Sequence, residues 1–291
     1  MVAELRVRPG RAAGLESRPT DRIRDRWPGG GGGRELVEAD LAEFVRELER
    51  AQELLYASAT HSVLVVLQAQ DAAGKDGTIK HVMSGLNPQG CRVHSFKQPS
   101  REELAHDFHW RYQQRLPERG EIVIFNRSYY EEVLVVRVHP ELLGPDAGSD
   151  PAPPDRYWRR RYQDICAFER HLHRQGTKLV KVFLHVSREE QRRRLLERLE
   201  DPRRFWKFSA ADLVERRRWD DYQRCYEEAL TSTSTSWAPW YVVPADHKYQ
   251  LRALVGGLVV EAISHLDLRL PAPKASTLEE MAAARAELQG G

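Results

Sequence analysis

The feature of this 291-residue chain that most restricts its fold is an alternation of short β-branched runs with longer amphipathic segments. Runs rich in Val, Ile and Phe predict strands, and the spacers are long enough for helices. Strands that alternate with helices form a parallel sheet with helices on both faces. Five strands are predicted, at Ser62–Gln68, Cys91–Phe96, Glu121–Phe125, Lys178–Val186 and Trp240–Val243. Helices are predicted at Lys75–Ser84, Arg101–Arg115, Arg156–Gln175, Arg188–Leu199, Ala210–Leu230 and Tyr249–Leu266.

The domain organisation follows from where this pattern begins and ends. Residues 1–34 contain Pro, Arg and the run Gly29–Gly33 without an apolar period, so we expect a disordered or loosely attached extension. Residues 35–270 are expected to form one α/β domain, since a chain of this length still folds around a single core. The tail, 271–291, starts with Pro-Ala-Pro and ends in an Ala/Glu stretch that favours a short helix.

Composition excludes several classes of protein. With 45 basic and 43 acidic residues, the net charge of +2 gives no overall attraction for nucleic acid or membranes. Cys91, Cys166 and Cys225 are scattered and form no CxxC pair, which excludes a zinc ribbon or a disulfide framework and favours the cytoplasm. Apolar runs such as Val63–Leu67 are too short to span a bilayer.

The loop after the first strand predicts a phosphate site. Ligands bind beyond the carboxyl ends of parallel strands, and a small-residue turn before a helix offers N–H groups to an anion. Lys75 can reach the outer phosphates, and Asp71 adds a carboxylate suited to Mg²⁺. The pattern GxxxxGK[ST] is not met, because Ala69 and Asp76 replace its first Gly and its hydroxyl residue. An ordinary turn with a surface Lys is the alternative. The predicted phosphate-binding loop comprises Ala72, Ala73, Gly74, Lys75, Asp76 and Gly77.

The loop after the third strand carries Asn126 and Arg127. P-loop enzymes keep a second metal-side residue here, usually an acid. The amide of Asn126 can accept a hydrogen bond from metal-bound water or orient a nucleotide, whereas Arg127 can stabilise charge on a transferring phosphoryl group. Alternatively, Asn126 caps the next helix.

With both loops in view, the chain resembles the polyphosphate kinase 2 family from about Leu54 to Leu266. The markers are Asp-Ala-Ala-Gly-Lys-Asp-Gly at 71–77, Asn87-Pro-Gln-Gly90, Phe-Asn-Arg-Ser-Tyr-Tyr-Glu at 125–131, Lys178–Val186 with Glu190-Gln191, Arg198-x-x-Asp-Pro202, Trp206-Lys207, Trp219-x-x-Tyr222, and Ala238-Pro-Trp-Tyr-Val-Val-Pro-Ala-Asp246 with Lys248. The resemblance implies a thymidylate-kinase-like P-loop fold with a helical lid at about 188–225. It also implies reversible, Mg²⁺-dependent transfer of a terminal phosphoryl group between polyphosphate and a nucleotide, with Mn²⁺ as an alternative ion, and a homodimer or homotetramer.

The resemblance also assigns roles to residues. Asp71 and Lys75 match the Walker A loop, with Asp71 as the metal ligand, and Asn126 and Arg127 match the Walker B position. Many family members have Asp where this chain has Asn126, and the Asn form resembles the class III-like branch that uses nucleoside mono- and diphosphates. AMP and ADP are therefore the expected acceptors, with GMP and GDP as further options. Glu131 is a candidate for sensing whether the acceptor bears one phosphate or two.

An enzyme that acts on a linear polyanion needs a cationic track, and residues 188–207 hold eight basic residues against five acidic ones. The pair Asp201-Pro202 is expected to break the helix and hinge the lid. Arg192–Arg194 are expected on a solvated helix face paired with Glu side chains. Contacts with phosphate or nucleotide are expected from Arg198, Arg204 and Lys207, from Lys80, for which a surface position is the alternative, and from Lys97 on the acceptor side.

Three rival functions remain open. An ATP-driven nucleoside monophosphate kinase on the same fold would need a second base pocket, which the sequence does not reveal. A non-catalytic RNA- or DNA-binding protein would be strongly basic, unlike this chain. A degenerate, structural member of the fold is conceivable from Ala69 and Asn126, although Asp71, Lys75 and Arg127 are intact.

Overall fold

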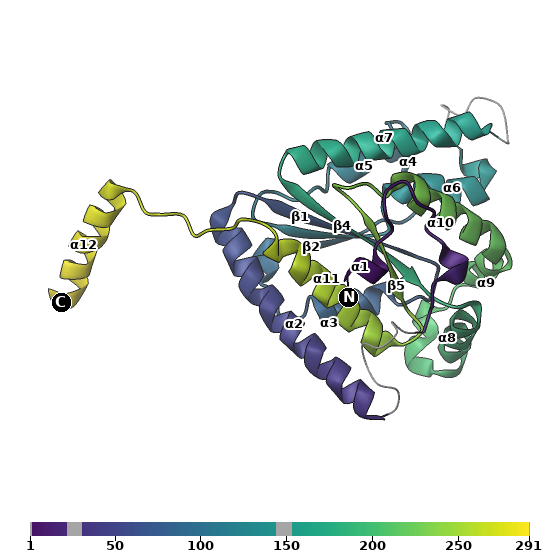
Figure 1. Cartoon of the computed structure of the whole chain (residues 1–291), viewed down its shortest axis with the longest axis horizontal. Helices are drawn as coiled ribbons and strands as arrows, with labels where there is room; N and C mark the ends of the chain where they lie inside the picture. Colours follow the sequence, from purple (N-terminus) through teal and green to yellow (C-terminus); the bar gives the residue numbers. More distant parts are fainter. Residues whose placement is uncertain (1, 22–30, 144–152, 291) are drawn as a thin grey trace.

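A computed structural model describes residues 2–21, 31–143 and 153–290 (Figure 1). Its centre is one five-stranded sheet in the order β2-β3-β1-β4-β5, and all four strand pairs are parallel. The strands are β1 Ser62–Ala69, β2 Cys91–Ser95, β3 Ile122–Asn126, β4 Thr177–His185 and β5 Trp240–Pro244. The predicted five-stranded parallel sheet is therefore confirmed.

Helices cover both faces of this sheet, as Figure 1 shows with α2 and α11 on one side and α7 and α10 on the other. The α-helices are α1 Val2–Leu5, α2 Gly31–Ser58, α3 Lys75–Val82, α4 Arg101–Leu104, α5 Trp110–Gln113, α6 Val135–Val138, α7 Asp155–Arg174, α8 Arg188–Glu200, α9 Ala210–Arg217, α10 Trp219–Thr233, α11 Lys248–Ser264 and α12 Ala275–Gly290. Short 3₁₀ helices are η1 Leu15–Ser17, η2 Pro88–Gly90, η3 Tyr129–Val133, η4 Pro140–Leu142 and η6 Pro202–Lys207.

The central strand β1 divides the core into two layers. Val63, Val65 and Leu67 pack with α2, α3 and α11, whereas Leu64 and Val66 pack on the opposite face with α7 and α10. All of β1 is buried. A strand covered on both faces reads as a continuous apolar run, which is why this strand was clear in the sequence.

Three helical segments differ from the sequence-based expectation. The long helix α2 was not predicted, although it buries Val37, Leu48 and Leu55 along one side. The helix predicted over 101–115 is two short ones, because the Asp107 carboxylate accepts the His109 N–H and starts a new turn. The helix predicted over 210–230 breaks at Arg218 into α9 and α10.

The N-terminal segment 2–21 is a correction to the sequence-based expectation, because it packs against the domain. Leu5, Val7 and Leu15 are buried, and the Val7 N–H donates to the Trp240 carbonyl of β5 at 2.8 Å. Residues 31–34 belong to α2, while 22–30 lie outside the described residues. Four scattered apolar residues, including Ala13, were too few to show an apolar period in the sequence.

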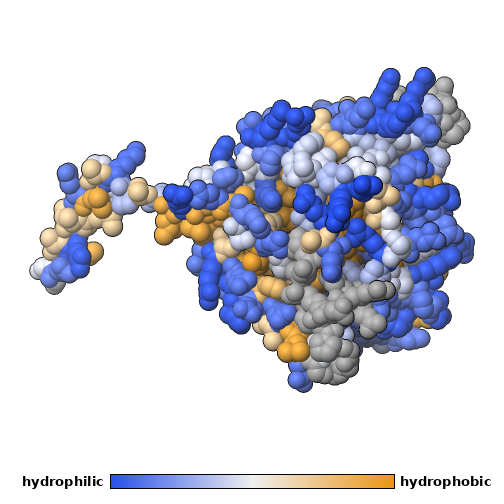
Figure 2. Space-filling view, viewed as in Figure 1, coloured by the Kyte–Doolittle hydropathy of each residue, from blue (hydrophilic) through white to orange (hydrophobic). Residues whose placement is uncertain are grey.

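The C-terminal tail ends in α12, which lies apart from the body of the molecule in Figure 1 and buries no residue. Figure 2 shows a largely hydrophilic surface over α7 and α10, with hydrophobic residues gathered where the chain leaves α11 toward α12. Among the helices of the described residues, none has the length and apolarity needed to cross a membrane.

Candidate active site

The loop between β1 and α3 has the backbone of an anion cradle. Gly74 has φ of 111°, a conformation open to glycine, and directly precedes the first residue of α3. Ala72 has φ of 61°, which is unusual for a residue with a side chain. The ammonium of Lys75 folds back and donates to the Ala69 carbonyl at 2.9 Å. Lys75 thereby sits over the loop at the N-terminus of α3, where an anion is favoured.

The second loop lies beside the first because β3 pairs with β1 in a register that sets Asn126 against Leu67. Arg127 has φ of 65°, and its guanidinium donates to Asp71 at 2.7 Å and to Glu131 at 3.2 Å. Non-glycine residues in this region cost energy and gather at functional sites. The two predicted loops therefore meet through an ion pair between Arg127 and Asp71.

Charge and burial set the proton affinities of the two cations. Burial, helped by the nearby Arg127 guanidinium, lowers the pKa of Lys75 to about 8. The pKa of Arg127 is raised, chiefly by Glu131, so its guanidinium stays charged. The free site thus holds one permanent cation and one ammonium that titrates close to neutral pH.

A pocket of about 500 Å³ opens over these loops. It lies between the phosphate loop, the end of β3, α8, η6 and the start of α11. Eight basic and three acidic side chains line it, which suits a polyanion. The lining is Asp71, Ala72, Ala73, Gly74, Lys75, Asp76, Gly77, Thr78, Asn126, Arg127, Arg194, Glu197, Arg198, Arg204, Lys207, Lys248, Leu251 and Arg252.

Most predicted site residues meet in this pocket. Asp71, Asn126 and the phosphate loop line it together with Arg198, Arg204 and Lys207. The others lie outside the lining. Lys80 is exposed on α3, and Lys97 follows β2, where its carbonyl accepts from Arg111 at 2.9 Å.

Glu131 also lies outside the lining and reaches the site through Arg127, as described above. The alternative role of Asn126 as a helix cap is not what the structure has, because Ser128 caps η3 instead. The Asn126 amide donates to Asp76 at 2.9 Å and to Ser95 at 3.2 Å.

Arg194 is a pocket residue that sequence reasoning missed. We expected it on a solvated face, and its pair with Glu190 at 2.6 Å is present, but the side chain is buried. Its guanidinium donates to the carbonyls of Ala72, Ala73 and Ala245 at 3.1, 2.6 and 2.5 Å, so α8 is tied directly to the phosphate loop. In contrast, Arg192 and Arg193 are exposed and paired with Glu residues as expected.

Lys248, Leu251 and Arg252, at the start of α11, were also missed as pocket residues. In the sequence, Lys248 was noted only as one of the residues by which the chain resembles its family. No local pattern marks Leu251 or Arg252, since they reach the pocket only because α11 packs beside α3.

The lid cations form internal ion pairs in this structure. Arg198 pairs with Asp212 at 2.6 Å, and Arg204 pairs with Glu197 at 2.6 Å. Lys207 lies over the Trp206 ring at 4.9 Å. These ion pairs and ring contacts hold the three cations at the wall of the pocket.

The residues present fit a divalent cation. Two carboxylates, Asp71 and Asp76, line the pocket, and the buried Oδ1 of Asn126 has no hydrogen-bond partner. Mg²⁺ favours one or two carboxylates together with water and substrate phosphate oxygens. Within the described residues, no group of three His, Cys, Asp or Glu side chains forms a metal site.

A parallel sheet with a phosphate loop after β1, a cationic pocket and a helical segment over it defines the class of P-loop phosphotransferases. Comparison with known proteins places the chain within that class. A family model described as "Polyphosphate kinase 2 (PPK2)" matches residues 33–270. The chain belongs to the polyphosphate kinase 2 family and is an enzyme that phosphorylates nucleotides at the expense of polyphosphate.

Individual relatives agree with this assignment. An "ADP-polyphosphate phosphotransferase" of Rhodopseudomonas palustris is 51% identical over 249 residues, covering 85% of this chain and 86% of the relative. An "AMP/ADP-polyphosphate phosphotransferase" of Meiothermus ruber is 48% identical over 246 residues, covering 84% and 88%. The crystal structure of polyphosphate kinase 2 from Arthrobacter aurescens superposes with a TM-score of 0.85 at 38% identity, covering 97% of this chain and 95% of that one.

Proposed function

We propose that this enzyme transfers the terminal phosphoryl group of inorganic polyphosphate to both AMP and ADP, in a reversible reaction. The observation that carries the proposal is the cationic pocket lined by Lys75 of the phosphate loop and by Arg127. The Meiothermus ruber relative is named for both acceptors, and the Rhodopseudomonas palustris relative for ADP. Asn126, in place of an acid, agrees with use of a monophosphate as well as a diphosphate.

The roles proposed for the residues follow from their positions. Backbone N–H groups of residues 72–77 and the Lys75 ammonium hold the phosphates between which transfer occurs. Arg127 stabilises the charge on the transferring group, which is the main catalytic requirement of phosphoryl transfer. Arg198, Arg204 and Lys207 hold the rest of the polyphosphate chain, and closure of the lid orients it.

A divalent cation, Mg²⁺ or alternatively Mn²⁺, is proposed at Asp71, with Asp76 and the Asn126 oxygen beside it. When bound, the ion neutralises charge on the phosphate oxygens. Asp71 is held toward the pocket by Arg127, and Asp76 by the Asn126 amide. These two contacts fix the direction of both carboxylates.

Several expectations stay predictions. GMP and GDP are proposed as further acceptors, and Lys97 and Lys80 as contacts to acceptor and polyphosphate. A homodimer or homotetramer and a cytoplasmic location also stay predictions.

The test is product analysis with purified enzyme and Mg²⁺. AMP, ADP, GMP or GDP is supplied with either polyphosphate or ATP as donor, with Lys75→Ala as the control. We expect ADP and ATP to form from AMP only with polyphosphate, and to be lost in the control because the phosphate contact is removed. Conversion of AMP with ATP alone would instead indicate a monophosphate kinase. Absence of turnover with every pair would overturn the proposal.

A further inference from the structure

The molecule contains a fully buried ion pair behind the active site. Lys181, in the middle of β4, and Glu169, on α7, are each 0% exposed and lie 2.7 Å apart. Removing two charges from water costs several kcal/mol per ion, and apolar replacements of such pairs are often at least as stable. Fold stability alone therefore gives little reason for this pair.

The ion pair makes hydrogen bonds to Tyr129 and Tyr130, which belong to the same 125–131 motif as Arg127. Glu169 accepts hydrogen bonds from the hydroxyls of Tyr129 at 2.9 Å and Tyr130 at 2.8 Å. Lys181 donates to the Tyr130 hydroxyl at 2.9 Å and to the Thr233 carbonyl at 2.8 Å. The Tyr130 hydroxyl oxygen also lies 2.9 Å from the Thr233 hydroxyl oxygen. We call these five residues (Tyr129, Tyr130, Glu169, Lys181 and Thr233) the Glu169–Lys181 cluster.

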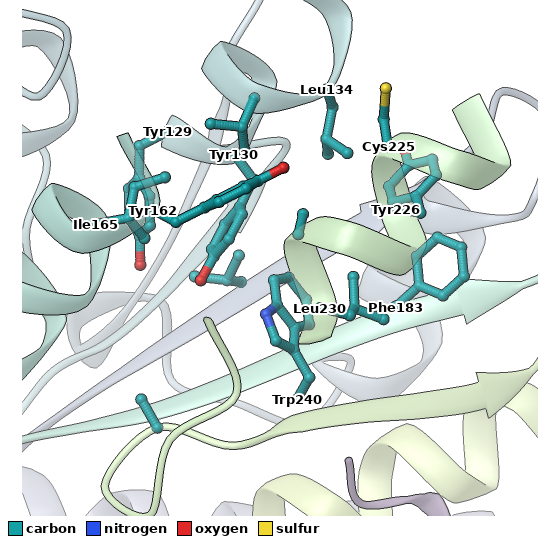
Figure 3. Packing of buried hydrophobic residues seen from close by; sticks show 14 of the residues in the cluster. Tyr129, Tyr130, Leu134, Tyr162, Ile165, Phe183, Cys225, Tyr226, Leu230 and Trp240 are labelled. Carbon is teal, nitrogen blue, oxygen red and sulfur yellow. The ribbon is translucent and has the colours of Figure 1, made fainter. Parts of the chain in front are cut away.

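The cluster joins the elements that meet behind the site. Its two tyrosines start η3, which begins two residues after Arg127, and Thr233 ends α10, the helix that leads back from the lid. Figure 3 shows Tyr129 and Tyr130 packed in the buried layer with Trp240, whose indole N–H donates to the Thr233 hydroxyl at 2.9 Å. A displacement of the tyrosines would therefore move the catalytic loop relative to both α7 and α10.

Arg127 needs such support because of its backbone. Its left-handed φ of 65° is unfavourable for a residue with a side chain and persists only where the surroundings impose it. On the N-terminal side of Arg127, the chain is held because Asn126 is the last residue of β3. On the C-terminal side, the Ser128 hydroxyl accepts a hydrogen bond from the Gln68 amide at 3.0 Å. The Arg127 N–H also donates to the Leu67 carbonyl at 3.2 Å, and the tyrosine anchors add to these contacts.

We propose that the Glu169–Lys181 cluster is a positioning device, which holds Tyr129 and Tyr130, and through them Arg127, in the arrangement that directs its guanidinium at Asp71. The proposal rests on the catalytic role proposed for Arg127. The cluster residues do not line the pocket. Their contribution is the placement of a group that does.

Tyr→Phe substitutions test the proposal cleanly. In Tyr130→Phe every remaining polar group keeps a partner, since Glu169 retains Tyr129 and Lys181, and Lys181 retains Glu169 and Thr233. The double variant Tyr129→Phe/Tyr130→Phe detaches the motif from the ion pair while the rings still fill the core.

Tyr162→Phe is the matched control, because Tyr162 is buried in the same layer but its hydroxyl contacts Arg137.

We expect kcat of the double variant to fall roughly tenfold or more, since small displacements of catalytic groups have effects of this size or larger. KM for polyphosphate and ADP should change little. The kcat of each single variant should lie between that of the parent enzyme and that of the double variant. The control should keep its kcat. Thermal unfolding of each protein serves to show that the variants are folded at the assay temperature. Should the double variant fail to fold, the two single variants decide.

A double-mutant cycle with Arg127→Ala separates positioning from general weakening of the fold. If the tyrosines act through Arg127, their substitution should have almost no further effect on kcat in the Arg127→Ala background. An equal loss in both backgrounds, or a double variant with the parent's kcat, would overturn the proposal. In that case a large fall in the kcat of Arg127→Ala alone would leave the proposed function intact. An unchanged kcat in Arg127→Ala would remove the catalytic role proposed for Arg127 as well.

Discussion

At the scale of single residues, the site brings two cations together by surrounding them with carboxylates. The Lys75 ammonium and the Arg127 guanidinium repel each other, and Asp71, Asp76 and Glu131 offset this repulsion. An incoming phosphate can take over part of that role because it brings its own negative charge. The free enzyme is therefore the state in which Lys75 holds its proton least firmly.

The first prediction concerns Lys75 and pH. Its pKa is lowered to about 8, so the ammonium is charged below that pH and loses its charge as pH rises through it. Only the charged form attracts phosphate, and kcat/KM follows the free enzyme. We expect kcat/KM for polyphosphate to fall as pH rises through about 8. In Lys75→Arg the guanidinium stays charged, and this fall should disappear even if activity is lower. A flat profile in the parent enzyme would contradict the prediction.

The second prediction concerns the acceptor. Glu131 contacts Arg127 at 3.2 Å and lies just beyond the residues that line the pocket. Its negative charge should disfavour the more highly charged acceptor. In Glu131→Gln we expect the ratio of kcat/KM for AMP to that for ADP to fall by about threefold or more, on the scale of about 1 kcal/mol for a weakened charged contact. Initial rates with each acceptor measure this, and an unchanged ratio would remove Glu131 from acceptor selection.

At the scale of elements, α8 and η6 supply four of the eight basic side chains that line the pocket. Asp201 caps the end of α8 and Pro202 starts η6, so the predicted break of the helix at this pair is present. One face of α8 is solvated, while its other face reaches the phosphate loop through Arg194. The same helix therefore has both an ordinary exposed surface and a functional one, which allows a matched comparison.

The third prediction compares a pocket cation on η6 with an exposed Arg on the solvated face of α8. Arg204→Ala removes a pocket cation, and we expect KM for polyphosphate to rise about tenfold, since hydrogen bonds to charged groups contribute about 1.5–3 kcal/mol. Arg192→Ala removes an exposed Arg on α8, paired with Glu189 outside the pocket, and should leave KM unchanged. Steady-state kinetics at low salt, where screening is weakest, gives the clearest contrast. Equal effects of the two substitutions would mean that the pocket cations do not contact polyphosphate.

At the scale of the whole molecule, the N-terminal segment covers one edge of the sheet. β5 is an edge strand, and residues Arg6 and Val7 pair with it through an antiparallel bridge from Arg6 to Tyr241. Covering an edge in this way protects unpaired backbone groups. The segment is also anchored by Leu15, whose N–H donates to Glu227 at 2.8 Å. Residues before the family match thus contribute to the core of the domain.

The fourth prediction follows from this packing. Leu15 is 4% exposed, so Leu15→Ala should lower the free energy of unfolding by about 2–5 kcal/mol, the usual cost for a buried Leu. Arg11→Ala, at an exposed position of the same segment, should have almost no effect. Urea unfolding measures both. If the segment were loosely attached, the two variants would be equally stable.

Much of the fold was predictable because it follows from local patterns. Buried parallel strands are continuous apolar runs; Arg127 directly follows such a strand, and Lys75 starts the helix after another. The breaks at 105–109 and at Arg218 were not predictable, since they depend on single polar contacts such as that of Asp107 with the His109 N–H. Helix α2 was missed because its apolar residues are widely spaced among many charges.

The sequence by itself determined the order of the five strands along the chain, the two loops that meet at the site, and the family to which they belong. These properties are local, since a strand, a turn and a helix start are adjacent in the chain. Only the tertiary structure decided that Arg194 is buried against the phosphate loop, that Arg252 lines the pocket, and that Glu169 and Lys181 anchor the motif behind Arg127. Each of these contacts joins segments far apart in the chain, so its free energy depends on packing that no local pattern records.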